Sequence, residues 1–402
     1  MTALRTVVWS TGGVGSNAID AIRRRPDLEL VGVWVHSPDK DGKDVGELTD
    51  ADQMGLAATT DADALIGLAP DCVVYAASGP ERDAGAVPDY VRLLEAGINV
   101  VSTSSTGLVF PPAYYSPDWL GQLEAAAKSG NASFYVSGIF PGFASDQLAL
   151  LMTTQSKNIR TITATEVALN DYYPVADVMM DGMGFGRPLD FEPMLRTPGF
   201  IELAWKAPIH LIAQGLGVEV EAIRGSLDRR LTDRDIDVAF GTIKAGTCGA
   251  VWTRAAGVVN GREAIIIDHI IRMARDVAPD WLASDFDATY RVDIEGEPDI
   301  HCAMTMGARP GPWRGGRGDG GDRHAGGQRD PVRGRSAART AQLSRHPDHA
   351  AQARVRLRSR RVHHEIRHAR AVIRGARGRP VFRRRRHVRV GGDTRLHRSG
   401  VV

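Results

Sequence analysis

Residues 6–22, TVVWSTGGVGSNAIDAI, combine an apolar β-branched run, a glycine-rich turn and apolar residues at helical spacing. Within this stretch, residues 10–15 follow the G-x-G-x-x-G pattern of dinucleotide-binding loops, with serine in the place of the first glycine. The second glycine lets backbone approach a pyrophosphate, and the third lets the helix pack closely on the strand. A purely structural strand-to-helix turn is the alternative. The context favours binding of NAD(P), with the expected contacts Ser10, Thr11, Gly12, Gly13, Val14 and Gly15.

The same strand–helix unit repeats along the chain. Further strands are predicted at residues 28–35, 71–77, 98–102 and 133–136. Because alternating strands and helices form a parallel sheet wound on both faces, we expect an α/β fold with a Rossmann domain over residues 1–150. Ligands bind at the carboxyl ends of such strands. The expected contacts there are Ser78, Gly79 and Ser102 for the cofactor and Thr103 for the substrate.

The end of the second predicted strand lacks the acidic residue that NAD-specific loops place there. Val35 is followed by HSPDK, and no carboxylate stands at the strand tip. An acidic residue at this point binds the ribose hydroxyl of NAD, whereas basic and hydroxyl side chains suit the 2′-phosphate of NADP. His36, Ser37 and Lys40 therefore favour NADP as the cofactor, with NAD as the alternative.

From residue 151 the pattern changes to longer strands, at residues 161–171, within 235–273 and at 290–306. A helical run occupies residues 198–217, and the glycine-rich run MMDGMGFGRP at 179–188 is interpreted as a mobile loop. This pattern predicts a second, mixed α+β domain over residues 151–306. We expect it to cover a small-molecule substrate and to carry the interface of a homo-oligomer.

Charge divides the chain near residue 307. Residues 307–402 contain 26 Arg, no Lys and six acidic residues, a net charge of +20, so the first 306 residues carry −18. The basic segment could be a nucleic-acid-binding arm, a solvated extension without a partner, or an amino-acid sequence translated out of frame after a shift of reading frame. The frameshift explains why Arg occurs without Lys, because GC-rich codons for Ala, Gly and Pro give Arg when read out of frame.

One run of the basic segment agrees with this interpretation. Residues 322–335, DRHAGGQRDPVRGR, can be back-translated so that reading one base later gives a short amphipathic helix, a proline and a strand-like run. We therefore interpret residues 307–402 as an unstructured, frameshift-like tail. Nucleic acid is not expected as a partner.

Composition limits the remaining function classes. With 43% apolar and 24% charged residues the chain has the profile of a soluble globular protein, and no run reaches the roughly 18 consecutive apolar residues of a membrane helix. The N-terminus lacks the pattern of a secretory signal. Cys72, Cys248 and Cys302 lie far apart, which indicates buried thiols in a reducing cytoplasm and no metal site.

Three motifs together resemble a known family. They are VVWSTGGVGS at residues 7–16, GIFPGFASDQLAL at 138–150 and DGMGFG at 181–186. The combination is similar to the dihydrodipicolinate-reductase-like family, nearest to its 2,4-diaminopentanoate dehydrogenase-like, actinobacterial branch, over about residues 3–306. The chain lacks the paired histidines and the following lysine that donates a proton in dihydrodipicolinate reductases. A role in lysine biosynthesis is therefore not expected.

The resemblance implies hydride transfer between a nicotinamide cofactor and a small amine, imine or amino-acid-like substrate. The protein would supply orientation and a proton-transfer group. Glu166, His210 and His269 are the candidates for that group. The simpler interpretation is that Glu166 is a hydrogen-bonded carboxylate of the sheet and that the two histidines are ordinary residues of a helix and a strand. No catalytic residue is assigned. A dinucleotide-binding protein without turnover, caused by the corrupted C-terminal segment, is the alternative function.

The motif at residues 138–150 is expected to shape the substrate site, together with Glu166. Pro141, Gly142 and Phe143 would lie at the start of a helix, and Asp146 would lie in its first turn, where the helix dipole favours a carboxylate.

Overall fold

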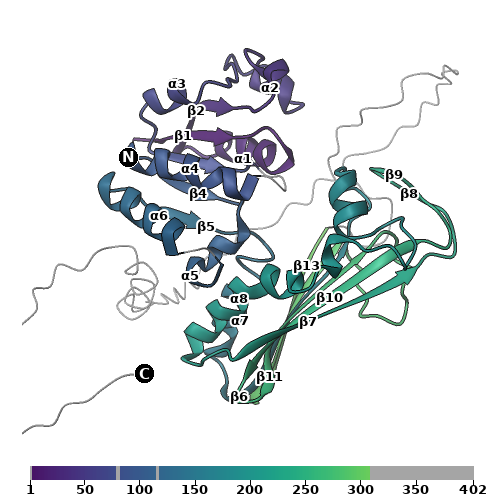
Figure 1. Ribbon diagram of the computed structural model, residues 1–402. Helices are drawn as coiled ribbons and strands as arrows, with labels where there is room; N and C mark the ends of the chain where they lie inside the picture. The colour runs from purple at the N-terminus through teal and green to yellow at the C-terminus, as the bar shows by residue number, and fades with distance from the viewer. Residues whose placement is uncertain (1, 78–81, 115–116, 308–402) are drawn as a thin grey trace, which may run out of the picture. The chain divides into compact units, whose positions relative to one another are not determined.

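Two large sheets organise the chain (Figure 1). The computed structural model describes residues 2–77, 82–114 and 117–307 of the 402 residues. The expectations for Ser78, Gly79 and the tail from residue 308 onward lie outside the described residues. Within the described ranges, the strands form a five-stranded sheet, a six-stranded sheet and a small sheet of β8 (Ile236–Val238) and β9 (Gly241–Ile243).

The first sheet is parallel throughout and has the order β2-β1-β3-β4-β5. Its strands are β1 (Leu4–Trp9), β2 (Leu28–Trp34), β3 (Cys72–Tyr75), β4 (Asn99–Ser102) and β5 (Phe134–Val136). The connecting elements are α1 (Gly13–Arg23), η1 (Pro38–Lys40), α2 (Val45–Leu48), α3 (Ala62–Gly67), α4 (Arg82–Glu95), η2 (Thr106–Val109), α5 (Pro111–Tyr114) and α6 (Pro117–Ser129). The predicted doubly wound parallel sheet is confirmed.

The central strand β1 is buried on both faces, as a parallel sheet requires. Val8 packs with Ile19 and Ile22 of α1 on one face. Val7 packs in a second core with Tyr90 of α4 on the other face. Successive strand residues point to opposite faces, so the continuous apolar run of β1 supplies both cores.

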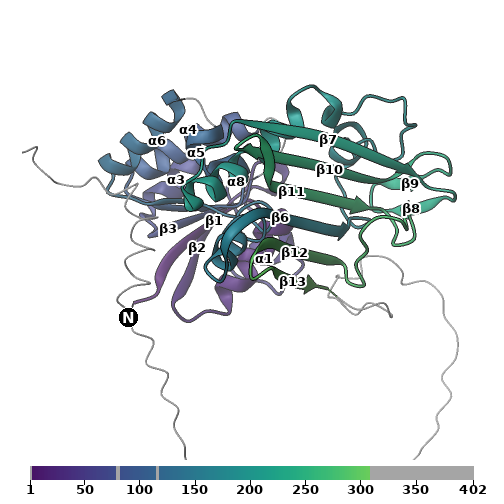
Figure 2. The same cartoon turned by 90° about the horizontal axis from the view of Figure 1, so that it is seen from below.

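The second sheet is mixed and has the order β13-β12-β6-β11-β10-β7. Figure 2 shows these strands side by side. Only the β6–β11 pair is parallel among the described pairs of this sheet. The strands are β6 (Lys157–Leu169), β7 (Ala222–Leu231), β10 (Cys248–Val259), β11 (Arg262–Arg272), β12 (Ala288–Glu297) and β13 (Ile300–Met306). The other elements are α7 (Gln147–Thr153), η3 (Val178–Gly182), η4 (Met194–Arg196) and α8 (Phe200–Leu216).

One face of the second sheet, called here the inner face, packs against α8. Ile209 and Ile212 of α8 share a core with Ala164 of β6, Ile267 of β11 and Val292 of β12. We call the opposite side the outer face. Because side chains alternate along a strand, His269 lies on the inner face and its neighbour Asp268 on the outer face.

The predicted mixed second domain is confirmed, with two corrections. Strand β7 was not predicted, because its sequence AIRGSLDRRL alternates weakly and is largely polar, as suits an edge strand. The interpretation of residues 179–188 as a mobile loop is wrong. Met179 and Phe185 in this run are 1% and 0% exposed and lie in the core of the second sheet.

Across the described part of the chain, none of the helices combines the length and the hydropathy that a membrane crossing demands.

Candidate active site

The loop between β1 and α1 has the geometry of a phosphate-binding turn. Ser10, which stands where the pattern has its first glycine, adopts a φ of +113°, a conformation that glycine reaches most easily. The Ser10 hydroxyl accepts a hydrogen bond from the Gly12 amide at 3.1 Å. A Cβ on Gly15 would overlap the Ser10 carbonyl oxygen, so only glycine fits where α1 begins. This close approach is the role that the pattern gives to its third glycine.

The N-terminus of α1 offers backbone amides to a ligand. Gly12 is the N-cap and makes no side-chain capping hydrogen bond, and the first turn carries no acidic side chain. A Cβ on Gly13 would meet nothing within 4 Å, and Val14 is 52% exposed. The open amides and the positive end of the helix dipole together favour an anionic group at this point.

A solvent-open pocket with an empty volume of about 500 Å³ lies beside this turn. Its lining residues are Ser10, Thr11, Gly12, Trp34, Val35, His36, Ser37, Lys40 and Ala77. The Nζ atom of Lys40 lies 3.4 Å from Oγ1 of Thr11, which ties η1 to the glycine turn. The structure thus gathers six of the residues expected to contact the cofactor around one pocket.

The carboxyl end of β4 is held by an internal hydrogen-bond network. Ser102 is fully buried, and its hydroxyl lies 2.9 Å from the Tyr90 hydroxyl and accepts from the Ser104 amide at 3.0 Å. The Ser102 side chain is therefore engaged within the protein and supports the loop. The next residue, Thr103, is exposed, and its amide donates to the Tyr75 carbonyl at 3.0 Å.

Asp146 organises the turn that leads into α7. Its buried carboxylate accepts hydrogen bonds from the amides of Gly142 and Gln147, both at 2.7 Å, and from the Ser145 hydroxyl at 2.8 Å. Asp146 is the N-cap of α7 and so lies just before the first turn in which it was expected. Burial raises the pKa of the Asp146 carboxyl, and the three hydrogen bonds offset only part of that rise.

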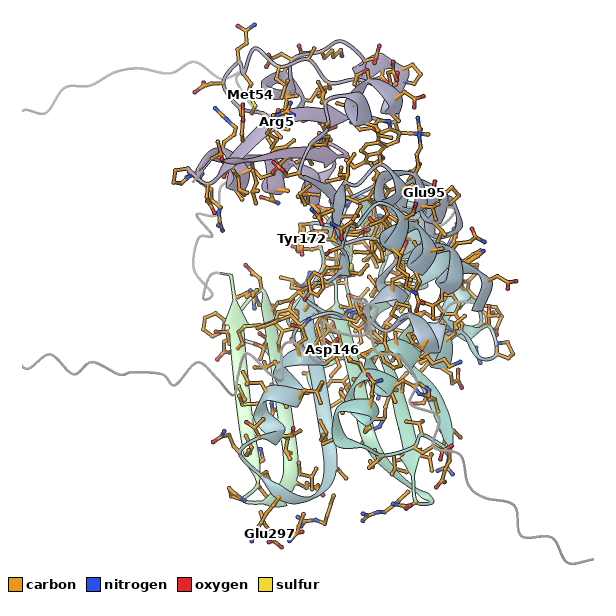
Figure 3. The ribbon with its side chains drawn as sticks, turned by 90° about the vertical axis from the view of Figure 1, so that its left-hand side faces the viewer. Arg5, Met54, Glu95, Asp146, Tyr172 and Glu297 are labelled. Atoms are coloured by element: carbon orange, nitrogen blue, oxygen red, sulfur yellow. The ribbon has the colours of Figure 1, made fainter. Side chains whose placement is uncertain are left out.

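The residues expected beside the substrate occupy this same turn. Gly142 has a φ of +119°, and a Cβ there would collide with the backbone of Gly138, so glycine is required. Pro141 and Gly142 are buried, whereas Phe143 is 40% exposed. Phe143 is therefore the side chain of the three that a ligand could contact. Figure 3 labels Asp146, whose carboxylate accepts a hydrogen bond from the Gly142 amide.

Glu166 lies on the inner face of the second sheet between His269 and Tyr290. Its Oε2 atom is 3.1 Å from Nε2 of His269, the residue beside it on β11. Tyr290 lies opposite Glu166 on β12. Burial raises the pKa of the Tyr290 phenol, and the charge of Glu166 and a hydrogen bond to it raise that pKa further. The phenol therefore stays protonated and donates to the carboxylate.

Two aromatic rings lie against this group. The Phe140 ring centroid is 5.3 Å from that of Trp205 on α8 and 6.2 Å from those of both His269 and Tyr290. Trp205 meets His269 edge to face at 5.3 Å. The turn at residues 138–146 thus reaches the inner face of the second sheet through Phe140.

The third proton-transfer candidate, His210, lies on α8 outside the Glu166–His269 pair. Burial and the charge of Lys206 lower the pKa of its imidazole, so His210 is neutral at physiological pH.

Sequence reasoning did not single out Tyr290, Phe140 or Trp205. The alternation of residues 290–294 could have placed Tyr290 on the apolar face of its strand. The pairing with Glu166 could not be found this way, because strand register depends on the assembled sheet.

Comparisons with known proteins agree with this architecture. Residues 143–312 match the family model of the 2,4-diaminopentanoate dehydrogenase C-terminal domain. An amine dehydrogenase of Streptomyces virginiae is 36% identical over 305 residues, which cover 75% of this chain and 84% of that protein. A 2,4-diaminopentanoate dehydrogenase of Acetoanaerobium sticklandii is 24% identical over 280 residues, 67% of this chain and 76% of that protein.

Among solved structures, the amine dehydrogenase from Mycobacterium smegmatis shares the fold. Its TM-score is 0.60 at 20% identity, over 75% of this chain and 86% of that one. The resemblance stated from the three sequence motifs is confirmed and refined, because the dihydrodipicolinate-reductase-like grouping is the coarser placement. The chain belongs to the 2,4-diaminopentanoate dehydrogenase-like family of amine dehydrogenases.

Proposed function

We propose that this chain is an NAD(P)-dependent amine dehydrogenase, which transfers hydride between a nicotinamide cofactor and a small amine or its imine. The observation that carries the proposal is the pocket shared by the β1–α1 turn and the end of β2. The bound cofactor would supply the hydride chemistry, and the protein would orient the substrate and exclude water. The names of the two relatives support an amine as the substrate.

The residues of the pocket fit a dinucleotide, and we propose NADP as the preferred one. The amides at the start of α1 would hold the pyrophosphate. His36, Ser37 and Lys40 would surround the 2′-phosphate, and no carboxylate that could repel it occurs among the described residues of the pocket lining. A single exposed lysine contributes on the order of 1 kcal/mol, so NAD would still bind.

We propose that the substrate contacts Thr103, Pro141, Gly142, Phe143 and Glu166. Thr103 is exposed at the carboxyl end of β4, where ligands of parallel sheets bind. Phe143 belongs to the turn whose Phe140 ring contacts His269 beside Glu166. Backbone of Pro141 and Gly142 would shape the site, since both side-chain positions are buried.

The test is an activity screen on the full chain. Reduction of NADP⁺ and NAD⁺ would be followed with a panel of primary amines and amino acids, and the reverse reaction with ketones, ammonia and NADPH. We expect turnover of at least one primary amine, with a lower KM for NADP⁺. Quenching of tryptophan fluorescence would report the binding of NADPH, since Trp34 lines the pocket. Binding without turnover of any substrate would favour the dinucleotide-binding protein instead.

We also propose that the enzyme is a homo-oligomer. The inner face of the second sheet is occupied by α8, so the outer face is the sheet surface that we assign to the contact. Light scattering on the purified chain would reveal the assembly, and a monomer at micromolar concentration would contradict it.

A further inference from the structure

Four polar side chains form a row across the inner face of the second sheet. In the strand register, Tyr290 lies opposite Glu166, Glu166 lies beside His269, and His269 lies opposite Thr253. Paired residues point to the same face of a sheet, so the row crosses β12, β6, β11 and β10 at one level. We call these residues the polar row. On one side of the row, its neighbours on the same face belong to the apolar core under α8. On the other side they are Val251, Ile271 and Ala168, which belong to a second apolar core.

Such a row is costly in an apolar core, because buried polar groups lose their water. The Glu166 side chain is only 11% exposed, and that of His269 is 18% exposed. The Tyr290 phenol donates to the Glu166 carboxylate, and the His269 Nε2 atom lies 3.1 Å from the same carboxylate. A carboxylate has room for about four hydrogen bonds, so it can accept further donors from a ligand.

Thr253, at the end of the row, carries a polar atom without a partner. Its side chain is 2% exposed, and its Oγ1 has no hydrogen-bond partner within the described ranges. An unsatisfied buried hydroxyl costs about 1–3 kcal/mol. The cost is explained if the partner of this hydroxyl arrives with a ligand next to His269.

The aromatic rings beside the row suit a cation. The ring centroids of Phe140 and Trp205 lie 5.3 Å apart, and both rings contact the imidazole of His269. The face of an aromatic ring attracts an ammonium group, and the pair also limits the access of water. A carboxylate, an unpaired hydroxyl and two rings therefore meet in one place.

We propose that the polar row binds the ammonium group of the substrate and that Glu166 accepts its proton. The proposal rests on the proposed amine dehydrogenase function and deepens it. The substrate class is a primary amine whose reacting carbon carries an apolar group, which would pack on Phe140 and Trp205. Thr253 would hydrogen-bond the same nitrogen or a water bound to it.

Amine oxidation begins with the loss of a proton from the substrate nitrogen. One N–H bond of the ammonium breaks, and its proton passes to a Glu166 oxygen, leaving a lone pair on nitrogen. The C–H electron pair then leaves as hydride to the oxidised nicotinamide, and the lone pair forms the C=N bond of the iminium product. The proton on Glu166 then passes to solvent, which restores the carboxylate for the next turnover.

The first experiment replaces the carboxylate of Glu166 with an amide of the same shape. Glu166→Gln in the full chain should lower kcat for amine oxidation roughly 100-fold or more, the usual scale of a lost proton acceptor. Affinity for NADPH should stay within about twofold, since a proton acceptor for the substrate contributes nothing to dinucleotide binding. Asp268→Asn is the matched control, because it removes a buried carboxylate that is adjacent to His269 in sequence but lies on the outer face of the sheet. There the Asp268 carboxylate accepts a hydrogen bond from the Trp252 indole at 2.9 Å. This control should change stability and leave kcat unaltered.

The outcomes separate this proposal from the proposed function. Turnover by the wild type together with near wild-type kcat in Glu166→Gln would overturn the role of Glu166 and leave the function standing. A wild type without activity on any amine would overturn the function itself, and the role of Glu166 with it.

The second experiment uses Thr253→Val, which removes the hydroxyl at nearly constant volume. If the hydroxyl serves the ligand, the melting temperature should rise or stay the same while KM for the amine increases about tenfold, the value of one lost hydrogen bond. A hydroxyl with a structural role would instead lower the melting temperature and leave KM unchanged. That second result would remove Thr253 from the site.

Discussion

The two sheets of this protein build their candidate sites in opposite ways. At the first sheet, the pocket is lined mainly by two short stretches of chain, residues 10–12 and 34–40. At the second sheet, each member of the polar row comes from a different strand. The first site is a local structure, and the second exists only once four strands have paired.

This difference decides how each site responds to change. A turn such as residues 10–15 depends on backbone conformation, so replacing a single glycine removes the whole site. The polar row is supported by the paired strands around it, so a side chain can be changed without loss of the sheet. We therefore expect large effects from backbone positions at the first sheet and separable effects of side chains at the second.

The largest effect is expected at the glycine turn. Gly15→Val should abolish dinucleotide binding, a loss of roughly 100-fold or more, because its Cβ would overlap the Ser10 carbonyl oxygen and displace α1. Isothermal titration with NADPH checks this, with circular dichroism to show that the chain is folded. Gly121→Ala in α6 is the control for a helical glycine outside the pocket, since nothing lies within 4 Å of its Cβ. Unchanged affinity in Gly15→Val would refute the assignment of the pocket to a dinucleotide.

The next effect concerns the turn before α7. Asp146→Ala should lower the free energy of unfolding by about 1–3 kcal/mol, because two amides and the Ser145 hydroxyl lose their buried acceptor. Affinity for NADPH should not change, since Asp146 lies outside the pocket. Denaturant unfolding and titration measure the two quantities. A loss of NADPH affinity as large as the loss of stability would mean that the turn before α7 and the dinucleotide pocket are not independent.

The Asp146 effect should also depend on pH. Its folded-state pKa is raised, so its contribution to stability is fully present below the unfolded-state pKa, about 3.9, and declines as the pH rises through the folded-state value. The stability difference between wild type and Asp146→Ala should therefore be largest in acid. A difference that grows with pH would show that the ionised form is the one the fold prefers.

A smaller effect is expected from a side chain at the edge of the pocket. Lys40→Ala should weaken NADPH binding up to about tenfold and leave NADH binding nearly unaltered, because the lysine would contact only the 2′-phosphate. Lys43→Ala is the matched control, since Lys43 pairs with Glu47 at 3.8 Å and does not line the pocket. Equal loss for both dinucleotides would remove the argument for NADP.

The smallest effect tests how closed the second sheet is. Cys248 is 0% exposed, and burial raises the pKa of its thiol to about 11. Because the thiolate is the reactive form, Cys248 should resist alkylation at pH 8 in the folded chain and react fully in denaturant. Mass spectrometry of the labelled peptides checks this. Rapid labelling of the folded chain would show that the strand opens readily.

Sequence reasoning was most successful where the signal is local. Strands β2 to β5 begin within a residue of the predicted bounds, and β1 begins two residues before its predicted run, because continuous apolar runs between turns are typical of buried parallel strands. The long helix α8 was found from its apolar spacing. The edge strand β7 was missed because its residues are mostly charged or small, and the packed run at residues 179–188 was misjudged because glycine suggests mobility.

The sequence by itself determined the glycine turn, the doubly wound sheet and the residues His36, Ser37 and Lys40, because each of these follows from the order of neighbouring residues. It could name Glu166 and His269 but could not pair them. Only the tertiary structure brought Glu166 between His269 and Tyr290 and left the Thr253 hydroxyl beside them without a hydrogen-bond partner among the residues that the structure describes. The physical reason is register: a shift of one residue would turn every side chain of a strand to the other face, and the packing of the whole sheet against α8 selects one register.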